Sequence, residues 1–134
     1  MADRKKWSPT RIKFVEATVM AHGANGRVHV RLEREGEPVM GQGGAGDTLM
    51  DEMRSSAQAA LDALQQVAPP DTVFALREVA PVAALGQSFV LAVVEFRRGR
   101  QFHTLLGVCP MSLNVVRDAA LAVLHATNRI TSLG

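Results

Sequence analysis

The alternation of apolar and polar residues in the first half of the chain predicts three strands followed by a helix. Residues 11–21 mix apolar and polar side chains, and the pair Asn25-Gly26 after them is typical of a two-residue hairpin turn. Residues 27–33 then alternate strictly, as a strand with one solvent-exposed face does. A short third strand is expected at 38–43.

From Thr48 the spacing of apolar residues becomes three or four, which predicts an amphipathic helix. The apolar stripe of this helix consists of Met50, Met53, Ala57, Ala60, Leu61, Leu64 and Val67. Asp47 is the expected N-cap, because a carboxylate at that position can accept hydrogen bonds from the free amides of the first turn. Pro69 and Pro70 predict the end of the helix.

The second half repeats this order of elements. Strands are expected at 73–85, 87–97 and 100–108, and Pro81 makes the first of them bent or an edge strand. Ser112 is the expected cap of the second helix. The apolar stripe of that helix consists of Leu113, Val116, Ala120, Val123, Leu124 and Ile130.

A constant, ungapped offset that places Gly36 on Gly99 aligns further like residues of the two halves. It pairs Gly23 with Gly86, Val30 with Val93, Arg34 with Arg97, Gly44 with Gly107, Ala59 with Ala122, and Ala63 with Ala126. Such self-similarity indicates that one unit occurs twice.

We therefore predict an α+β fold, a tandem βββα-βββα duplication with antiparallel sheets and two helices packed on them. Residues 1–11 form a basic leader, and 12–134 form a single domain whose repeats span about 12–67 and 73–130. The leader either reaches a phosphate backbone or is simply solvated.

The strand within 87–97 is apolar on both faces, whereas helices on one side of a sheet require only one apolar face. The second face must therefore meet the other half of the chain, a second subunit or a ligand. We favour a second subunit in a homodimer. The predicted interface consists of Phe89, Leu91 and Val93 on one face, and Val90, Val94 and Phe96 on the other.

Composition agrees with one globular domain. The chain has 134 residues, of which 47% are apolar and 21% are charged, and its net charge is +2. No apolar run is long enough to span a membrane. The first residues are basic and lack an apolar stretch, so we expect no secretory signal. The single Cys109 suits a reducing compartment, so we expect a cytoplasmic protein.

The run from Gly41 to Met53 contains G-x-G-x-x-G before a helix, which is the pattern of a dinucleotide-binding turn. That site requires a parallel βαβ unit, whereas the preceding strand belongs to a hairpin. Asp47, Asp51 and Glu52 also place negative charge where a phosphate would bind. We therefore expect no nucleotide cofactor.

No other residues form a catalytic pattern. The four histidines lack metal-ligand spacing, so we expect no metal. Cys109 precedes a helix whose dipole could lower its pKa, or it is a small structural residue. Since no base accompanies a nucleophile, we expect a protein that is not an enzyme.

With the duplicated unit laid out, the second half resembles the C-terminal regulatory, dimerisation domain of 2-isopropylmalate synthases. "NVV" at Asn114–Val116 and "HATNRI" at His125–Ile130 correspond to the ends of the family's helix, although Asn114 replaces the usual Asp. The first half is similar to the family's first unit, in which a Gly-rich turn also precedes the helix. The resemblance covers about residues 11–130.

The resemblance implies a homodimeric regulatory module with a small-molecule effector, a metabolite or an amino acid. The effector site would lie at a subunit boundary near both helix starts, formed by Gly43, Gly44, Ala45, Gly46, Asp47, Gly107, Val108, Cys109 and Pro110. The family's catalytic barrel is absent from this sequence, so a stand-alone domain is expected.

Three strands followed by a helix also resemble a double-stranded-RNA-binding domain, which places lysines at the helix start. This chain has Asp51 and Glu52 at one helix start and Leu113–Val115 at the other. We therefore do not expect a nucleic-acid partner, but the basic leader keeps this alternative open.

Overall fold

The computed structural model describes residues 12–21, 26–44 and 46–133, and it confirms the predicted α+β arrangement. The first unit consists of β1 (Lys13–Ala21), β2 (Arg27–Arg34), β3 (Glu37–Gly44) and α2 (Leu49–Val67). The second consists of β4 (Thr72–Ala84), β5 (Gln87–Arg98), β6 (Gln101–Pro110) and α3 (Val115–Leu133). The predicted leader at 1–11 lies outside the described residues.

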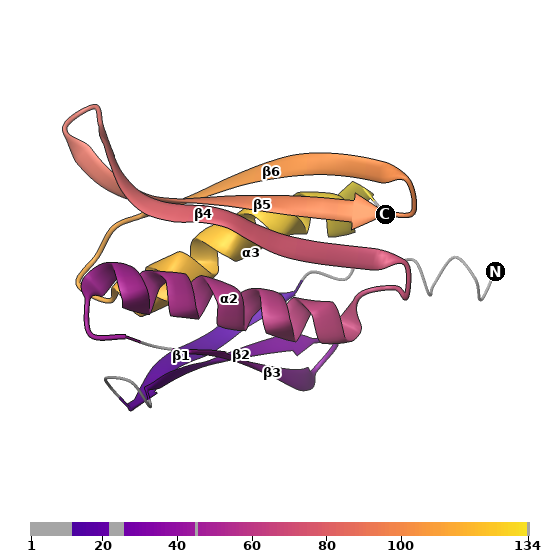
Figure 1. Cartoon of the computed structure of the whole chain (residues 1–134), viewed down its shortest axis with the longest axis horizontal. Coiled ribbons are helices and arrows are strands. Elements are labelled where there is room, and N and C mark those ends of the chain that lie inside the picture. Colours follow the sequence, from indigo (N-terminus) through magenta and orange to yellow (C-terminus); the bar gives the residue numbers. More distant parts are fainter. Residues whose placement is uncertain (1–11, 22–25, 45, 134) are drawn as a thin grey trace.

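The elements form three layers, with both helices between two antiparallel sheets (Figure 1). The sheets have the strand orders β1-β2-β3 and β4-β5-β6. Each helix packs on the last two strands of its own unit and also on the first strand of the other, so that α2 contacts β4 and α3 contacts β1. The two repeats therefore share one hydrophobic core.

The helix stripes explain why the core forms in the middle layer. In α2, Met53, Ala57, Ala60, Leu61 and Leu64 are buried, as the spacing predicts. In α3, the stripe is confirmed from Val116 to Leu124, but Leu113 precedes the helix and is fully exposed, so its place in the stripe was wrong. The side chain of Ile130 lies outside the described part.

The ungapped offset between the halves holds for the helices and fails for the strands. Val30 is fully buried against the helices, whereas Val93 points to the opposite side of its sheet. Since successive side chains of a strand alternate between faces, an error of one residue reverses every assignment. The residue that matches Gly107 in space is Gly41, and not Gly44 as the offset predicted.

Candidate functional site

The glycines of the G-x-G-x-x-G run allow helix α2 to approach strand β3. A Cβ at Gly41 would collide with the Ala59 carbonyl oxygen and lie 2.6 Å from the Ala63 amide nitrogen, and a Cβ at Gly43 would collide with the Ser55 carbonyl. Strand β3 is antiparallel to β2, so the βαβ unit of a dinucleotide site is not formed here. Gly41 and Gly43 therefore have a packing role, which the sequence analysis did not predict.

Helix α2 begins with a capping box that already occupies one of the free amides of its first turn. Thr48 Oγ1 accepts a hydrogen bond from the Asp51 amide at 3.0 Å, and Asp51 Oδ2 accepts one from the Thr48 amide at 3.3 Å. Hydrogen bonding to the Thr48 side chain, and then to its backbone, lowers the pKa of Asp51. The N-cap is thus Thr48, and the prediction of Asp47 was wrong by one residue.

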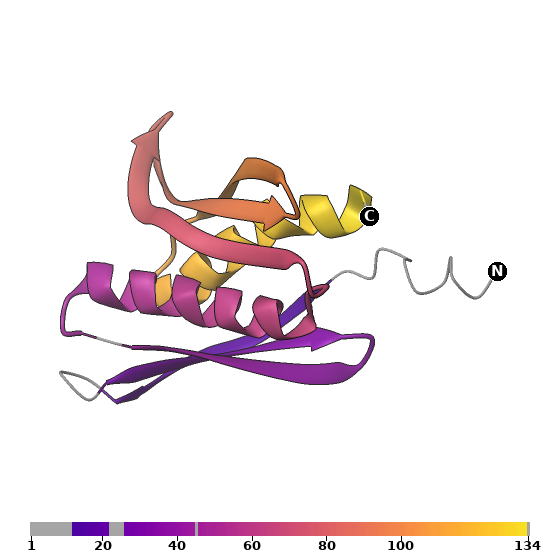
Figure 2. The ribbon, with the colours of Figure 1, turned by 45° about the vertical axis from the view of Figure 1, so that its right-hand side comes forward.

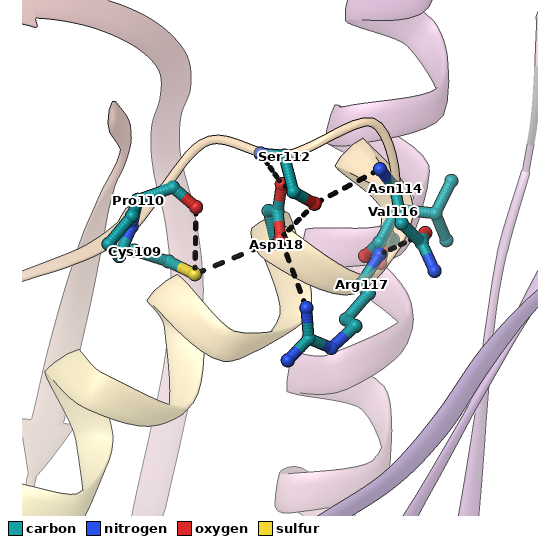
Figure 3. A network of polar contacts seen from close by, with 8 residues as sticks. Cys109, Pro110, Ser112, Asn114, Val116, Arg117 and Asp118 are labelled. Carbon is teal, nitrogen blue, oxygen red and sulfur yellow. Dashed lines mark hydrogen bonds and ion pairs between the residues drawn. The ribbon is translucent and has the colours of Figure 1, made fainter. Parts of the chain in front are cut away.

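The start of α3 is held by a buried carboxylate (Figure 3). Asp118 is fully buried and accepts hydrogen bonds from the Ser112 amide at 2.6 Å and the Ser112 hydroxyl at 2.9 Å. The Cys109 thiol lies 3.9 Å from the same carboxylate, and an Arg117 guanidinium nitrogen lies 3.8 Å from it. This network ties the end of β6 to the first turn of the helix.

Asn114 caps this helix, because its Oδ1 accepts from the Arg117 amide at 3.1 Å and its carbonyl accepts from the Asp118 amide at 3.0 Å. The prediction of Ser112 as the cap was therefore wrong. Ser112 instead bridges the Asn114 amide and the Asp118 carboxylate. Both residue types are common caps, and only the position of the first helical turn distinguishes them.

Cys109 has the environment of a structural thiol. Partial burial raises its pKa first, the nearby Asp118 carboxylate raises it further, and Arg117 acts in the opposite direction. A raised pKa reduces the fraction of reactive thiolate at neutral pH. The suggestion that the helix dipole activates this cysteine is therefore wrong, and its role as a small packed residue is supported.

One hollow of the described part of the chain includes two of the nine predicted ligand residues. A hollow of about 360 Å³ lies beside the start of α2, lined by Gly44, Gly46, Asp51, Arg54, Ser55 and Gln58. Only two of the nine predicted residues, Gly44 and Gly46, line this hollow, and none of Gly107, Val108, Cys109 or Pro110 does. Ala45 lies outside the described residues.

Sequence reasoning missed four lining residues, Asp51, Arg54, Ser55 and Gln58. Their signal was their spacing, because residues three and four apart share one helix face. Arg54 and Asp51 hold opposite charges side by side, with a guanidinium nitrogen 3.9 Å from a carboxylate oxygen and both side chains about half exposed. The hollow thus offers a cation and an anion to a small polar molecule.

The outer face of β4-β5-β6, which points away from the helices, is mostly apolar over five cross-strand rows. In order of increasing distance from the β4–β5 turn, the rows are Val82-Phe89-Pro110, Ala80-Leu91-Val108, Glu78-Val93-Leu106, Ala75-Glu95-Thr104 and Val73-Arg97-Phe102. We call this surface the outer B face. Phe102 is 67% exposed and Leu106 is 50% exposed.

Half of the predicted interface lies on the outer B face. Phe89, Leu91 and Val93 point outward there and are partly exposed. The other predicted residues, Val90, Val94 and Phe96, are buried against the helices of the same chain, so their assignment to an interface was wrong. The sequence showed two apolar faces, but it did not show which one the helices cover.

The outer face of β1-β2-β3 is polar by contrast. Arg31 pairs with Glu16 across the strands at 3.7 Å, and an Arg27 guanidinium nitrogen donates to Gln42 at 3.3 Å. His29 lies on the same face, opposite Thr18. The two sheets of the duplication therefore differ most on the sides that face away from the helices.

Comparison with known proteins identifies no family for the chain. No protein-family model matches it, and no curated protein matches it significantly. The resemblance to 2-isopropylmalate synthase regulatory domains thus stays a prediction. Over the described ranges, neither helix combines the length and apolarity that a membrane crossing requires.

Proposed function

We propose that this chain is a non-catalytic module that acts by associating with another protein through the outer B face. The observation that carries the proposal is the contrast between the two outer sheet faces, one charged and one apolar. A contiguous exposed apolar patch usually marks a protein interaction site. A domain needing only its own core would have polar residues on both outer faces.

The predicted resemblance supports the same kind of role, since dimerisation and regulation belong to the domain that this chain resembles. We place its action in the cytoplasm, where its free Cys109 stays reduced. The helix starts do not favour the nucleic-acid alternative, because Asp51 and Glu52 stand in the first turn of α2 and Asp118 in that of α3.

The association can be tested in extracts of cells that make the chain at its native level. We expect the tagged chain to elute well above its monomer mass of 14.4 kDa. Leu106→Lys, which places a charge in the third of the five rows of the outer B face, should shift it to monomer mass. Met40→Lys is the matched control, because Met40 is 43% exposed on the outer face of the other sheet. A wild-type chain that elutes as a monomer would refute this function.

A regulatory ligand is a second candidate activity, favoured by the charge pair in the hollow beside α2. Arg54 can bind a carboxylate and Asp51 an ammonium group, which together suit a zwitterion such as an amino acid. We expect a branched-chain amino acid to raise the melting temperature of the wild type but not of Arg54→Ala. Equal shifts in both proteins would exclude the hollow as the binding site.

A further inference from the structure

We infer that the partner on the outer B face is a second copy of this chain, packed face to face with the turn of the β4–β5 hairpin included. This inference rests on the association proposed above.

The charges of the outer B face are balanced, which permits it to meet a copy of itself. Arg77 pairs with Glu95 at 2.7 Å, and the Arg97 guanidinium lies 5.8 Å from the centre of the Phe102 ring. Glu78 is the second acidic residue on this face. With two cations and two anions, a twofold arrangement avoids net like-charge repulsion.

The charged and apolar residues of this face are also separated as in an interface with a core and a rim. The two rows nearest the β4–β5 turn hold six apolar residues and no charged one, whereas Glu78, Glu95 and Arg97 lie in the three rows beyond, with Arg77 at the bulge beside Glu78. Pairing through the apolar rows would leave the charges at the border, where water still reaches them.

Side chains of the helices occupy some of the edge groups of β3, β4 and β6. The Gln42 amide of β3 donates to Asp62 of α2 at 3.0 Å, and the Val108 amide of β6 donates to His125 of α3 at 3.0 Å. On β4, Gln65 bonds both the Thr72 carbonyl and the Phe74 amide. Because unpaired edge amides are what a neighbouring strand would bind, these contacts disfavour edge-to-edge pairing.

The area of the face approaches what a stable dimer requires. Strands about 4.8 Å apart and five rows about 7 Å apart give a flat area of roughly 500 Å². A standard interface buries about 800 Å² on each partner. The hairpin turn would add to the flat area, and two such sheets would pack about 10 Å apart.

The hairpin turn has an exposed leucine in a strained conformation. Leu85 is 98% exposed and has a φ of 54°, a region that costs residues with a Cβ and is typical of Asn or Gly in such turns. Residues 81–88 are exposed and contain no charged side chain. The hairpin bends away from the helices, so that its turn rises beside the outer B face (Figure 2). A partner on that face would lie within reach of Leu85.

Sedimentation velocity on the purified full-length chain tests this inference, over roughly 1–100 μM. We expect the wild type to form a dimer of twice the 14.4 kDa chain mass. Leu106→Lys should weaken the dimer by at least about ten-fold, because a buried unpaired charge is costly. Met40→Lys should change the dissociation constant of the dimer by no more than about two-fold.

A second variant separates folding from pairing. Leu85→Asn suits the turn conformation, so the variant should melt no lower than the wild type and still dimerise about five-fold or more weakly. A dimer unchanged by both Leu106→Lys and Leu85→Asn would overturn the face-to-face mode and leave association intact. A monomeric wild type would overturn the second copy as partner, and the extract experiment would then show whether another protein takes its place.

Discussion

At Gly41 a strand and a helix touch through their backbones, with no side chain between them. We expect Gly41→Ala to destabilise the fold by about 3 kcal/mol or more, since the new methyl group meets rigid backbone and not a movable side chain. Gly44→Ala is the control, because nothing lies within 4 Å of its Cβ position, and its effect should stay within about 1 kcal/mol. Urea unfolding of both variants measures the difference. Equal losses would show that Gly41 is not a close contact.

Cys109 should label slowly in the folded chain. Its raised pKa means that folding favours the protonated thiol. The stability from this preference is fully present below the unfolded pKa, near 8.5, and is lost as the pH rises through the folded pKa. We expect the pH midpoint of thiol labelling to lie above that of the urea-unfolded chain. Arg117→Ala should raise it further, because Arg117 lowers the pKa. If the labelling midpoint of the folded chain lay at or below that of the unfolded chain, the pKa of Cys109 would not be raised by folding.

At this scale the sequence predicted which residues of the helices are buried and failed at the ends of the helices. Met53 and Leu64 follow from spacing alone, because burial repeats with the helical period. Thr48 and Asn114 could not be chosen over Asp47 and Ser112, since all four side chains can cap and the choice depends on backbone angles.

At the scale of an element, the first turn of α2 depends on its capping box. We expect Thr48→Ala to cost about 1 kcal/mol of unfolding free energy, whereas Asp47→Ala should change little. Thr48→Ala should also flatten the acid limb of the stability curve. The stability contributed by Asp51 is present above its unfolded pKa and is lost as the pH falls below about 4 through the lower folded pKa. Chemical denaturation at pH 7 and pH 3 checks both effects. A larger loss from Asp47→Ala would reinstate Asp47 as the cap.

Strand β5 shows what the pattern of one element can predict. Its two apolar faces were visible in the sequence, yet Val94 and Val93 are chemically identical. The side that the helices cover depends on the path of α3 back across β5 and β6, which no local pattern contains.

At the scale of the whole molecule, the shared core makes each repeat dependent on the other. The Ser56 hydroxyl of α2 donates to the Val116 carbonyl of α3 at 2.5 Å, and both residues are buried. We expect fragments 12–67 and 72–134 to lack cooperative unfolding when separate, because each exposes half of the core. Mixing them should restore the helical circular dichroism signal. A fragment that folds alone would show that the repeats are independent domains.

The tandem order of elements was predictable, whereas the placement of both helices between the sheets was not. The available signal was the number of small residues in α2, where Ser55, Ser56, Ala59 and Ala63 are buried in addition to the apolar stripe. A helix buried on so wide a surface has neighbours on more than one side. The sequence analysis predicted only one buried stripe for this helix.

The backbone contacts at Gly41, Gly43 and Gly107 also bear on how distant relatives could be recognised. Larger core side chains can be exchanged for others of similar volume, so their identities are free to drift as sequences diverge. Glycine cannot be exchanged in this way, because it is the only amino acid that lacks a Cβ. A Gly-x-Gly pair late in the third strand and a lone glycine late in the sixth should therefore persist as a fingerprint after other similarity has faded.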